Sequence, residues 1–385
     1  MANMMDYLDW RGDLTLDQSP FNEVDNLILS QLAYLNLDYV VPPAVSGDSV
    51  TVREAAERYF AMYDERTVSS RGSLIRVTAA LLKKMADSPR FAHARMGKFA
   101  NVLDFGQMKQ FAAVQYWLDD GTIFVAYRGT DHTLVGWKEN FHMSFTTPVP
   151  SQFEALRYLE DTAGDAGVPL RLGGHSKGGN LAVYAAVMCR PAIRRRILEV
   201  YNNDGPGFDA RMTKSPEYRS MLGRIRKIVP QTSIVGMLRE HEEEYVVVRS
   251  SQNRFMQHDA MSWEVLGPQF VHLDRITEES RMLDMALKSW LRGMSRAERE
   301  RFVDALFQVF ELAEVRSFRD FSQAKWRKAR ALIKALNQSP ENKEILTRTF
   351  RLLFREGKRV FLESLEPKIP LRAGREEDDG GYDGM

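Results

Sequence analysis

Cysteine is nearly absent from this chain of 385 residues, which contains only Cys189. One thiol cannot form an internal disulfide, and we therefore expect a reducing compartment. No stretch approaches about eighteen consecutive apolar residues, so the sequence predicts no transmembrane helix. The first ten residues lack both the basic segment and the apolar segment of a secretory signal, and we expect a cytoplasmic protein.

A charge bias is also missing, because 53 Lys and Arg residues are balanced by 52 Asp and Glu residues, for a net charge of +1. This balance excludes a strong attraction of the whole molecule to nucleic acid or to anionic membranes. Hydrophobic residues make up 44% and charged residues 27%, which is ordinary for a folded globular protein. The length allows one large domain and a smaller one.

The chain does contain a G-x-S-x-G pentapeptide, at residues 174–178. It stands between a predicted strand at 168–173 and a predicted helix of small residues at 179–186, a context typical of the nucleophile elbow of α/β-hydrolases. The serine of such a turn is strained. Gly174 and Gly178 are needed there, because a Cβ would strike the neighbouring strand or helix. The alternative is an ordinary glycine-rich turn in which Ser176 only caps the helix.

Hydrophobic periodicity predicts the elements around this turn. Helices are predicted at 22–37, 51–64, 73–85 and 152–163, and strands at 111–118, 122–127, 197–202, 224–229 and 245–249. Asp119-Asp120-Gly121 predicts a hairpin between the first two strands. Strands that alternate with helices in this way predict an α/β-hydrolase fold, with a mostly parallel sheet covered by helices on both faces.

Beyond about Thr277 the strand patterns stop, and the sequence predicts an appended C-terminal α-helical module. Ser295 and Glu298 form a capping box that opens one helix, a second helix is predicted at 321–336, and Ser339-Pro340 opens a third that runs to about residue 362. We therefore divide the chain into an α/β-hydrolase domain with N-terminal helices at 1–275, a basic helical module at 276–372 and a disordered acidic tail at 373–385.

The helical module is basic, with 19 Lys and Arg against 11 Asp and Glu between Arg292 and Arg372. Such a surface is either the solvated face of an amphipathic bundle or a docking surface for an acidic partner, such as nucleic acid or anionic lipid. The aromatic residues of the module fall at helical spacing, which favours packing in a core over stacking on bases.

A serine nucleophile needs a histidine base and an acid that fixes the histidine tautomer. In α/β-hydrolases these follow the serine in the order acid, then histidine. His258 comes after the last predicted strand and is better placed as the base than His241 or His272. Asp204 directly follows a predicted strand and is the favoured acid, whereas Asp259 is weaker because adjacent side chains in an extended loop point apart. Alternatively, His258 is an ordinary surface histidine in a loop, and Asp204 is a turn residue whose side chain forms a hydrogen bond with its own backbone.

An oxyanion hole needs two backbone donors where negative charge develops. We expect the backbone amide of Lys177, the residue after the nucleophile, and a second backbone donor at Thr130, at the end of an earlier strand, where the threonine hydroxyl would also help to hold the loop. The Lys177 side chain would then be an exposed charge on the rim of the site or a solvent-facing residue of the turn. Apolar walls for an acyl group are expected after Thr130 and around residues 234–238. This chemistry needs no cofactor and no metal.

These motifs resemble the class 3 lipase group of α/β-hydrolases. The resemblance spans roughly residues 95–265 and rests on the elbow, on Tyr127-Arg128-Gly129-Thr130, on the segment 137–141 and on Glu244-Tyr245 ahead of His258. It implies a serine hydrolase that forms an acyl-enzyme. One departure is important, because this chain has Ser233 where those lipases carry the aspartate of the triad, and a serine cannot supply the charge. Asp204 resembles the acid of pancreatic-type lipases instead, and we expect Ser233→Ala to be nearly silent.

The chain also resembles a bacterial lipase-like family of unknown function, the Mbeg-like proteins. The shared segments include 7–12, 22–27, 174–180, 203–207 and 257–259, so the resemblance covers most of the first 270 residues. It implies the fold and little about the substrate. Two hypotheses follow: a cytosolic serine hydrolase acting on a small-molecule carboxylic ester or thioester, or an inactive hydrolase fold that serves as a binding or scaffold protein through the basic C-terminal helices. The full set of Ser, acid and His favours the enzyme.

Overall fold

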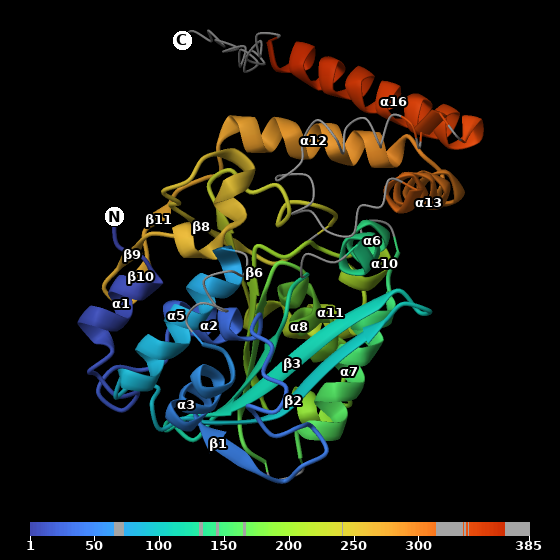
Figure 1. Ribbon diagram of the computed structural model, residues 1–385. Coiled ribbons are helices and arrows are strands. Elements are labelled where there is room, and N and C mark those ends of the chain that lie inside the picture. The colour runs from blue at the N-terminus through green and yellow to red at the C-terminus, as the bar shows by residue number, and fades with distance from the viewer. Residues whose placement is uncertain are drawn as a thin grey trace, which may run out of the picture.

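The computed structural model describes residues 1–64, 73–130, 134–143, 146–164, 167–240, 242–312, 334, 336–337 and 339–365. Its centre is a twisted sheet with helices on both faces, and three C-terminal helices lie across one end of the sheet (Figure 1). The described part of the chain therefore begins beside the sheet with α1 and ends with α16.

The strands are β1 Ser49–Thr51, β2 Arg95–Asp104, β3 Lys109–Trp117, β4 Ile123–Tyr127, β5 Leu170–His175, β6 Ile197–Asn203, β7 Ile225–Pro230, β8 Tyr245–Val248, β9 Val265–Leu266, β10 Gln269–Phe270 and β11 His272–Leu273. Within the described residues, all but β9 and β10 form one nine-stranded sheet in the order β1-β2-β3-β4-β5-β6-β7-β8-β11. Strands β4 to β8 are parallel, and antiparallel strands extend both edges. The parallel centre confirms the predicted fold class.

The helices are α1 Met4–Arg11, α2 Glu23–Leu32, α3 Val52–Met62, α5 Ser73–Asp87, α6 Leu134–Met143, α7 Pro150–Thr162, α8 Lys177–Met188, α9 Pro191–Arg194, α10 Ala210–Thr213, α11 Pro216–Met221, α12 Glu278–Arg292, α13 Arg296–Leu312 and α16 Pro340–Leu365. Helices α1, α2, α3 and α5 share one hydrophobic core, and α7 and α8 share another. The two cores lie on opposite faces of the sheet.

Strand β4 shows how the sequence fills both cores. Successive side chains of a strand point to opposite faces of the sheet. Phe124 and Ala126 accordingly pack in the core under the N-terminal helices, while Ile123, Val125 and Tyr127 pack in the core under α7 and α8. A strand that is apolar at every position, as this one is, must be covered on both faces.

Local signals in the sequence located several element boundaries correctly. Asn22 and Thr51 cap α2 and α3, each as part of a capping box. The predicted hairpin joins β3 to β4, with Gly121 at a φ of 76°. Strand β2 was not predicted, because a bulge between Gly97 and Ala100 interrupts its alternation.

The C-terminal helices pack on one another as well as on the sheet end. Ser295 and Glu298 form the predicted capping box ahead of α13, and Ser339 Oγ accepts a hydrogen bond from the Asn342 amide in the first turn of α16. Trp290 of α12 meets Phe302 of α13 edge to face, with ring centroids 5.6 Å apart. Most of the helix predicted at 321–336 and the tail predicted at 373–385 lie outside the described residues, and the division into domains stays a prediction.

The basic surface of this module is only partly visible. Six of its Lys and Arg residues fall within 313–333, outside the described residues. On α16, Arg348 pairs with Glu298 at 2.8 Å and Arg359 pairs with Glu356 at 3.0 Å. An acidic partner for the module therefore stays a prediction. Across the part of the chain that the structure describes, no helix has the length and apolar character needed to cross a membrane.

Candidate active site

Four of the five predicted site residues follow the carboxyl ends of parallel strands, and the fifth, Lys177, follows Ser176. Thr130 follows β4, Ser176 follows β5, Asp204 follows β6 and His258 follows β8. Strands β4 to β8 are parallel, so their carboxyl ends meet at one edge of the sheet. Ligands of open α/β sheets bind at this edge. The topology therefore brings together residues that are more than a hundred positions apart in the sequence.

Ser176 occupies a strained turn between β5 and α8. Its φ of 58° and ψ of −130° lie outside the regions that residues with a side chain prefer. A Cβ on Gly174 would come within 2.3 Å of the Gly178 carbonyl carbon, and a Cβ on Gly178 within 2.1 Å of the Tyr127 carbonyl oxygen. The two glycines allow the turn to form, and strain of this kind persists at functional sites.

Asp204 and His258 are in direct contact. His258 Nδ1 lies 2.7 Å from Asp204 Oδ2, the Asp204 side chain is buried, and the His258 side chain is 31% exposed. Since a carboxylate only accepts, Nδ1 carries the hydrogen and leaves Nε2 as the basic nitrogen. No hydrogen bond joins the Ser176 hydroxyl to His258 among the described residues. Such bonds are often long before substrate binds and tighten in the complex.

Ser233 has a place in this site that the sequence did not reveal. Its hydroxyl donates a hydrogen bond to Asp204 Oδ1, which also accepts one from the Gly236 amide at 3.1 Å. Asp204 itself sits at a φ of 51° immediately after β6, which turns its carboxylate toward these donors. The serine at the usual lipase aspartate position thus supports a carboxylate that comes from the neighbouring strand.

This contact replaces the expectation that Ser233→Ala is silent. Hydrogen bonds to charged groups are worth about 1.5–3 kcal/mol, and the candidate base His258 contacts this carboxylate. We expect Ser233→Ala to lower kcat/KM for an activated ester by about tenfold. Ser233→Thr, which keeps the hydroxyl, should lose less. Equal losses in the two variants would show that the hydroxyl does not support Asp204.

His175, the residue before the nucleophile, positions the backbone of His258. Its Nε2 lies 2.8 Å from the His258 carbonyl oxygen, and the Tyr34 hydroxyl lies 3.2 Å from its Nδ1. A carbonyl only accepts, so Nε2 carries the hydrogen and Nδ1 accepts from Tyr34. The two imidazole rings are close, with centroids 4.7 Å apart. The sequence did not reveal this role, although the histidine lies inside the elbow motif.

The burial of His175 predicts a loss of stability in acid. Burial, and then the nearby His258, lower the pKa of His175 well below its usual value of 6.5. Below about pH 6.5 the unfolded chain therefore binds a proton that the folded chain does not. Stability should be fully present above that pH and fall below it, by about 1.4 kcal/mol per pH unit from this residue. When the free energy of unfolding in urea is measured between about pH 5 and about pH 7, its dependence on pH should be weaker in His175→Gln than in the wild type. An equal pH dependence in the two proteins would show that His175 is not the group responsible.

The Lys177 side chain is buried, and both expectations for it were wrong. Its ammonium donates to Glu139 Oε2 at 2.9 Å and to the Gln110 carbonyl oxygen at 2.7 Å. Glu139 also accepts a hydrogen bond from the Ser151 amide at 2.8 Å. The first residue of α8 faces β3 and α6 rather than solvent, so the long side chain reaches inward to a buried carboxylate. Its charge joins α6 to the elbow.

Breaking this ion pair should destabilise the fold. Removing one partner of a buried pair leaves the other charge buried and uncompensated, at a cost of about 3–5 kcal/mol. We expect Lys177→Met to lower the free energy of unfolding by that amount in urea titration, and Lys177→Met with Glu139→Gln to recover part of it. A loss below about 1 kcal/mol in the single variant would contradict the buried pair.

The role of Thr130 as the second oxyanion donor stays a prediction, and Thr130 is not among the residues that line the cavity beside Ser176. Its Oγ1 is buried and lacks a hydrogen-bond partner in the described residues. Buried hydroxyls are normally satisfied, so an unpaired one at the end of β4 is a feature to explain. The Lys177 amide stands at the N-terminus of α8, where the helix dipole favours negative charge. The two predicted donors thus belong to adjacent strand ends.

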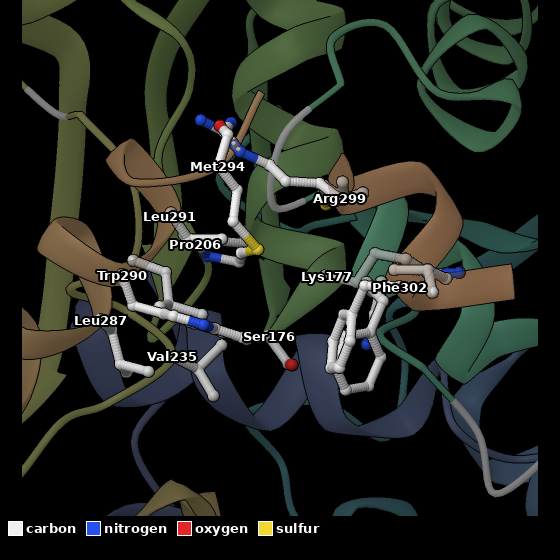
Figure 2. Close-up of a pocket in the computed structure, with 15 residues that line it drawn as sticks. Ser176, Lys177, Pro206, Val235, Leu287, Trp290, Leu291, Met294, Arg299 and Phe302 are labelled. Carbon is white, nitrogen blue, oxygen red and sulfur yellow. Dashed lines mark hydrogen bonds between the residues drawn. The ribbon is translucent and has the colours of Figure 1, made fainter. Parts of the chain in front are cut away.

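A cavity of about 240 Å³ opens in front of Ser176. Figure 2 shows the Ser176 hydroxyl among the lining side chains, with Trp290 and Val235 on one side and Phe302 on the other. Val235 and Leu238 line it, as predicted for residues 234–238, and α6 lines it after Thr130 through Asn140, Phe141 and Met143. Met237 is buried elsewhere.

Residues of the C-terminal helices, which were not predicted to line the site, form another part of the cavity wall. It consists of Leu287, Trp290 and Leu291 of α12, Met294 in the following turn, and Arg299, Phe302 and Val303 of α13. Positions 287, 290, 291 and 294 follow helical spacing, which predicts an apolar face but not what it covers. The C-terminal helices therefore form a roof over the candidate nucleophile.

A metal centre is not evident in the residues that the structure describes, since they contain no group of three or more His, Cys, Asp or Glu side chains placed to hold an ion. The expectation that the chemistry needs neither metal nor cofactor stays a prediction, because it concerns the reaction.

The parallel sheet and the strained serine between β5 and α8 place the chain in the α/β-hydrolase fold class. The Mbeg1-like family matches residues 85–308, more than half of the chain. The chain belongs to this family, as the sequence resemblance predicted. No curated protein matches it.

Several solved lipase structures are distantly similar to this chain. A Rhizomucor miehei lipase in complex with its propeptide is 16% identical and covers 60% of this chain and 81% of its own, with a TM-score of 0.33. A fungal lipase–inhibitor complex is 14% identical, covers 54% and 83%, and has a TM-score of 0.32. M37 lipase is 14% identical, covers 46% and 70%, and has a TM-score of 0.29. The fold assignment rests on the sheet topology and not on these scores.

Proposed function

We propose that this protein is a serine hydrolase that cleaves a carboxylic ester or thioester through an acyl-enzyme on Ser176. The observation that carries the proposal is the 2.7 Å contact between Asp204 and His258 at the sheet edge where Ser176 stands in its strained turn. A buried carboxylate that fixes a histidine tautomer beside an elbow serine is the arrangement that activates a hydroxyl. A cytoplasmic location, expected from the sequence, is part of the proposal.

In the first half of the reaction the Ser176 hydroxyl attacks the carbonyl carbon of the substrate. His258 Nε2 takes the hydroxyl proton, and Asp204 stabilises the imidazolium through its contact with Nδ1. The tetrahedral oxyanion binds the Lys177 amide and Thr130. The bond to the leaving oxygen or sulfur then breaks, and His258 gives its proton to that leaving group. An acyl ester of Ser176 remains.

In the second half a water molecule attacks the acyl carbonyl. His258 takes a proton from the water, and the same oxyanion donors hold the second tetrahedral intermediate. The bond to Ser176 Oγ breaks, His258 returns the proton to the serine, and the carboxylic acid leaves. The net reaction consumes one water and yields an acid and an alcohol or thiol.

Labelling with a fluorophosphonate probe tests this proposal. An activated serine forms a covalent adduct with such a probe, and peptide mass analysis should locate the adduct on Ser176. We expect the adduct to be lost in His258→Ala, because the serine is then no longer activated. A folded sample that does not react, while a control serine hydrolase does, would overturn the proposal.

That negative result would favour the second hypothesis, a hydrolase fold that serves as a binding or scaffold protein. The absence of an aspartate at position 233 was its motivation, and the contact of Ser233 with Asp204 now supplies another reason for the serine. A steeply salt-dependent affinity for nucleic acid or anionic lipid, without esterase activity, would support binding through the C-terminal helices.

A further inference from the structure

The roof over Ser176 is apolar, and it comes from a part of the chain that follows the last strand. Leu287, Trp290 and Leu291 project from one face of α12, and Phe302 projects from α13 (Figure 2). Val303 of α13 also lines the cavity. Val235, Leu238 and Pro206, which follow strands of the sheet, also line the cavity. A largely apolar cavity with the Ser176 hydroxyl in its wall restricts the chemistry of what can bind there.

The charged groups of the cavity wall already have partners or structural roles. Lys177 is paired with Glu139. Arg299 donates through Nε to the Met294 carbonyl oxygen at 3.1 Å, and burial lowers its pKa. That bond ties the start of α13 to the turn that follows α12. The remaining lining is mostly hydrocarbon, and its other polar side chains are Ser176 and Asn140, whose Oδ1 has no hydrogen-bond partner among the described residues.

The roof is attached to the body of the protein on several sides. Lys138 of α6 pairs with Asp304 of α13 at 3.1 Å, and the rings of Phe141 and Phe307 meet edge to face at 5.8 Å. At the other end, the amide of Thr277, which caps α12, donates to the Gln231 carbonyl oxygen at 2.7 Å. These contacts hold the cavity at a defined size, as a selective pocket requires.

We propose that α12, Met294 and α13 form an acyl-chain pocket, so that the substrate is an ester or thioester whose acyl group is a linear hydrocarbon chain and these helices limit its length. This inference rests on the proposed function. A short acyl group such as acetyl does not reach the apolar side chains of α12 and α13. A longer acyl chain contacts Trp290, Leu291 and Phe302 and displaces water from them. Each added methylene then improves binding until the chain reaches the end of the cavity.

Filling the cavity tests the proposal. Leu291→Trp places a larger side chain in the roof, and Leu287→Ala enlarges the pocket. Met285→Trp is the matched control, because Met285 is exposed on the same helix and does not line the cavity. The readout is the ratio of kcat/KM for p-nitrophenyl octanoate to that for p-nitrophenyl acetate. We expect Leu291→Trp to lower this ratio by at least about tenfold, Leu287→Ala to shift the preference to laurate, and Met285→Trp to leave the ratio unchanged.

Two further measurements separate the pocket from the chemistry. Fluorophosphonate labelling of Ser176 in each variant shows that the elbow is folded and activated. Calorimetry of free laurate with the Ser176→Ala protein measures the affinity of the pocket without turnover. Adding Leu291→Trp to this protein should weaken the affinity for laurate by at least about tenfold. Laurate binding without any labelling or hydrolysis would overturn the proposed function and keep the pocket. Labelling with no chain-length preference and no laurate binding would overturn the pocket and keep the function.

Discussion

Ser176→Ala is expected to lower ester turnover by about a million-fold, the scale on which a triad serine acts. The alanine keeps the Cβ and therefore the strained backbone at a φ of 58°, so the loss should come from the nucleophile and not from misfolding. A residual rate of about a thousand-fold or more over water should persist, because the oxyanion donors and the cavity remain. The measurement is kcat and kcat/KM for p-nitrophenyl butyrate, with urea unfolding to check the fold.

Ser220→Ala is the matched control for this variant. Ser220 is exposed on α11 and donates to the Glu217 carbonyl oxygen, so the same substitution there should leave turnover unchanged. A loss of less than tenfold in Ser176→Ala would show that the serine is not the nucleophile. The activity would then have to come from another group, and the acyl-enzyme mechanism would be wrong.

The sheet and its helices could be predicted because their signals are local. The capping boxes at Asn22 and Thr51 lie within a few residues of the helices they begin, and the uninterrupted apolar run of β4 identifies a strand covered on both faces. The bulge in β2 shows the limit of such reasoning. An extra residue breaks the period of two on which strand prediction depends, so the strand is visible only through its pairing with β3.

The candidate triad could be predicted for a different reason. Residues that follow parallel strands share an edge, so chain order alone placed Asp204 and His258 near Ser176. Chain order does not say which way a side chain points, and the predictions failed at that level. Lys177 faces the interior because Glu139, 38 residues earlier, provides a buried carboxylate. The contact of Ser233 with Asp204 likewise depends on how two loops pack.

The roof was beyond sequence reasoning because it depends on packing between distant elements. The pattern of α12 predicts an apolar face, and an apolar face can cover any neighbour. The structure also ties this helix to the candidate acid. The Ser280 hydroxyl of α12 donates to the Ser233 carbonyl oxygen, and the Ser233 hydroxyl donates to Asp204. The start of the roof and the support of the triad therefore share one residue, so a shift of α12 would disturb both.

Asp204→Asn is expected to lower kcat by about ten-thousand-fold, because the amide fixes the wrong histidine tautomer. Asp204 Oδ1 accepts hydrogen bonds from Ser233 and Gly236, and Oδ2 faces His258 Nδ1. An asparagine satisfies the first two donors with its oxygen, which turns its NH₂ group toward Nδ1. The imidazole must then accept at Nδ1 and carry its hydrogen on Nε2, where it cannot take the proton of Ser176.

Asp259→Asn is the matched control, since it makes the same change one residue after the histidine. Asp259 Oδ1 accepts from the Met261 amide at 3.1 Å and caps a short helical turn, so it does not orient His258. We expect this variant to stay within about tenfold of the wild-type kcat, with an unchanged rate of fluorophosphonate labelling, while Asp204→Asn loses most of its labelling. The opposite order of effects would assign the acid to Asp259. Similar small losses in both variants would mean that His258 acts without a buried carboxylate, and the contact on which the proposed function rests would then be structural only.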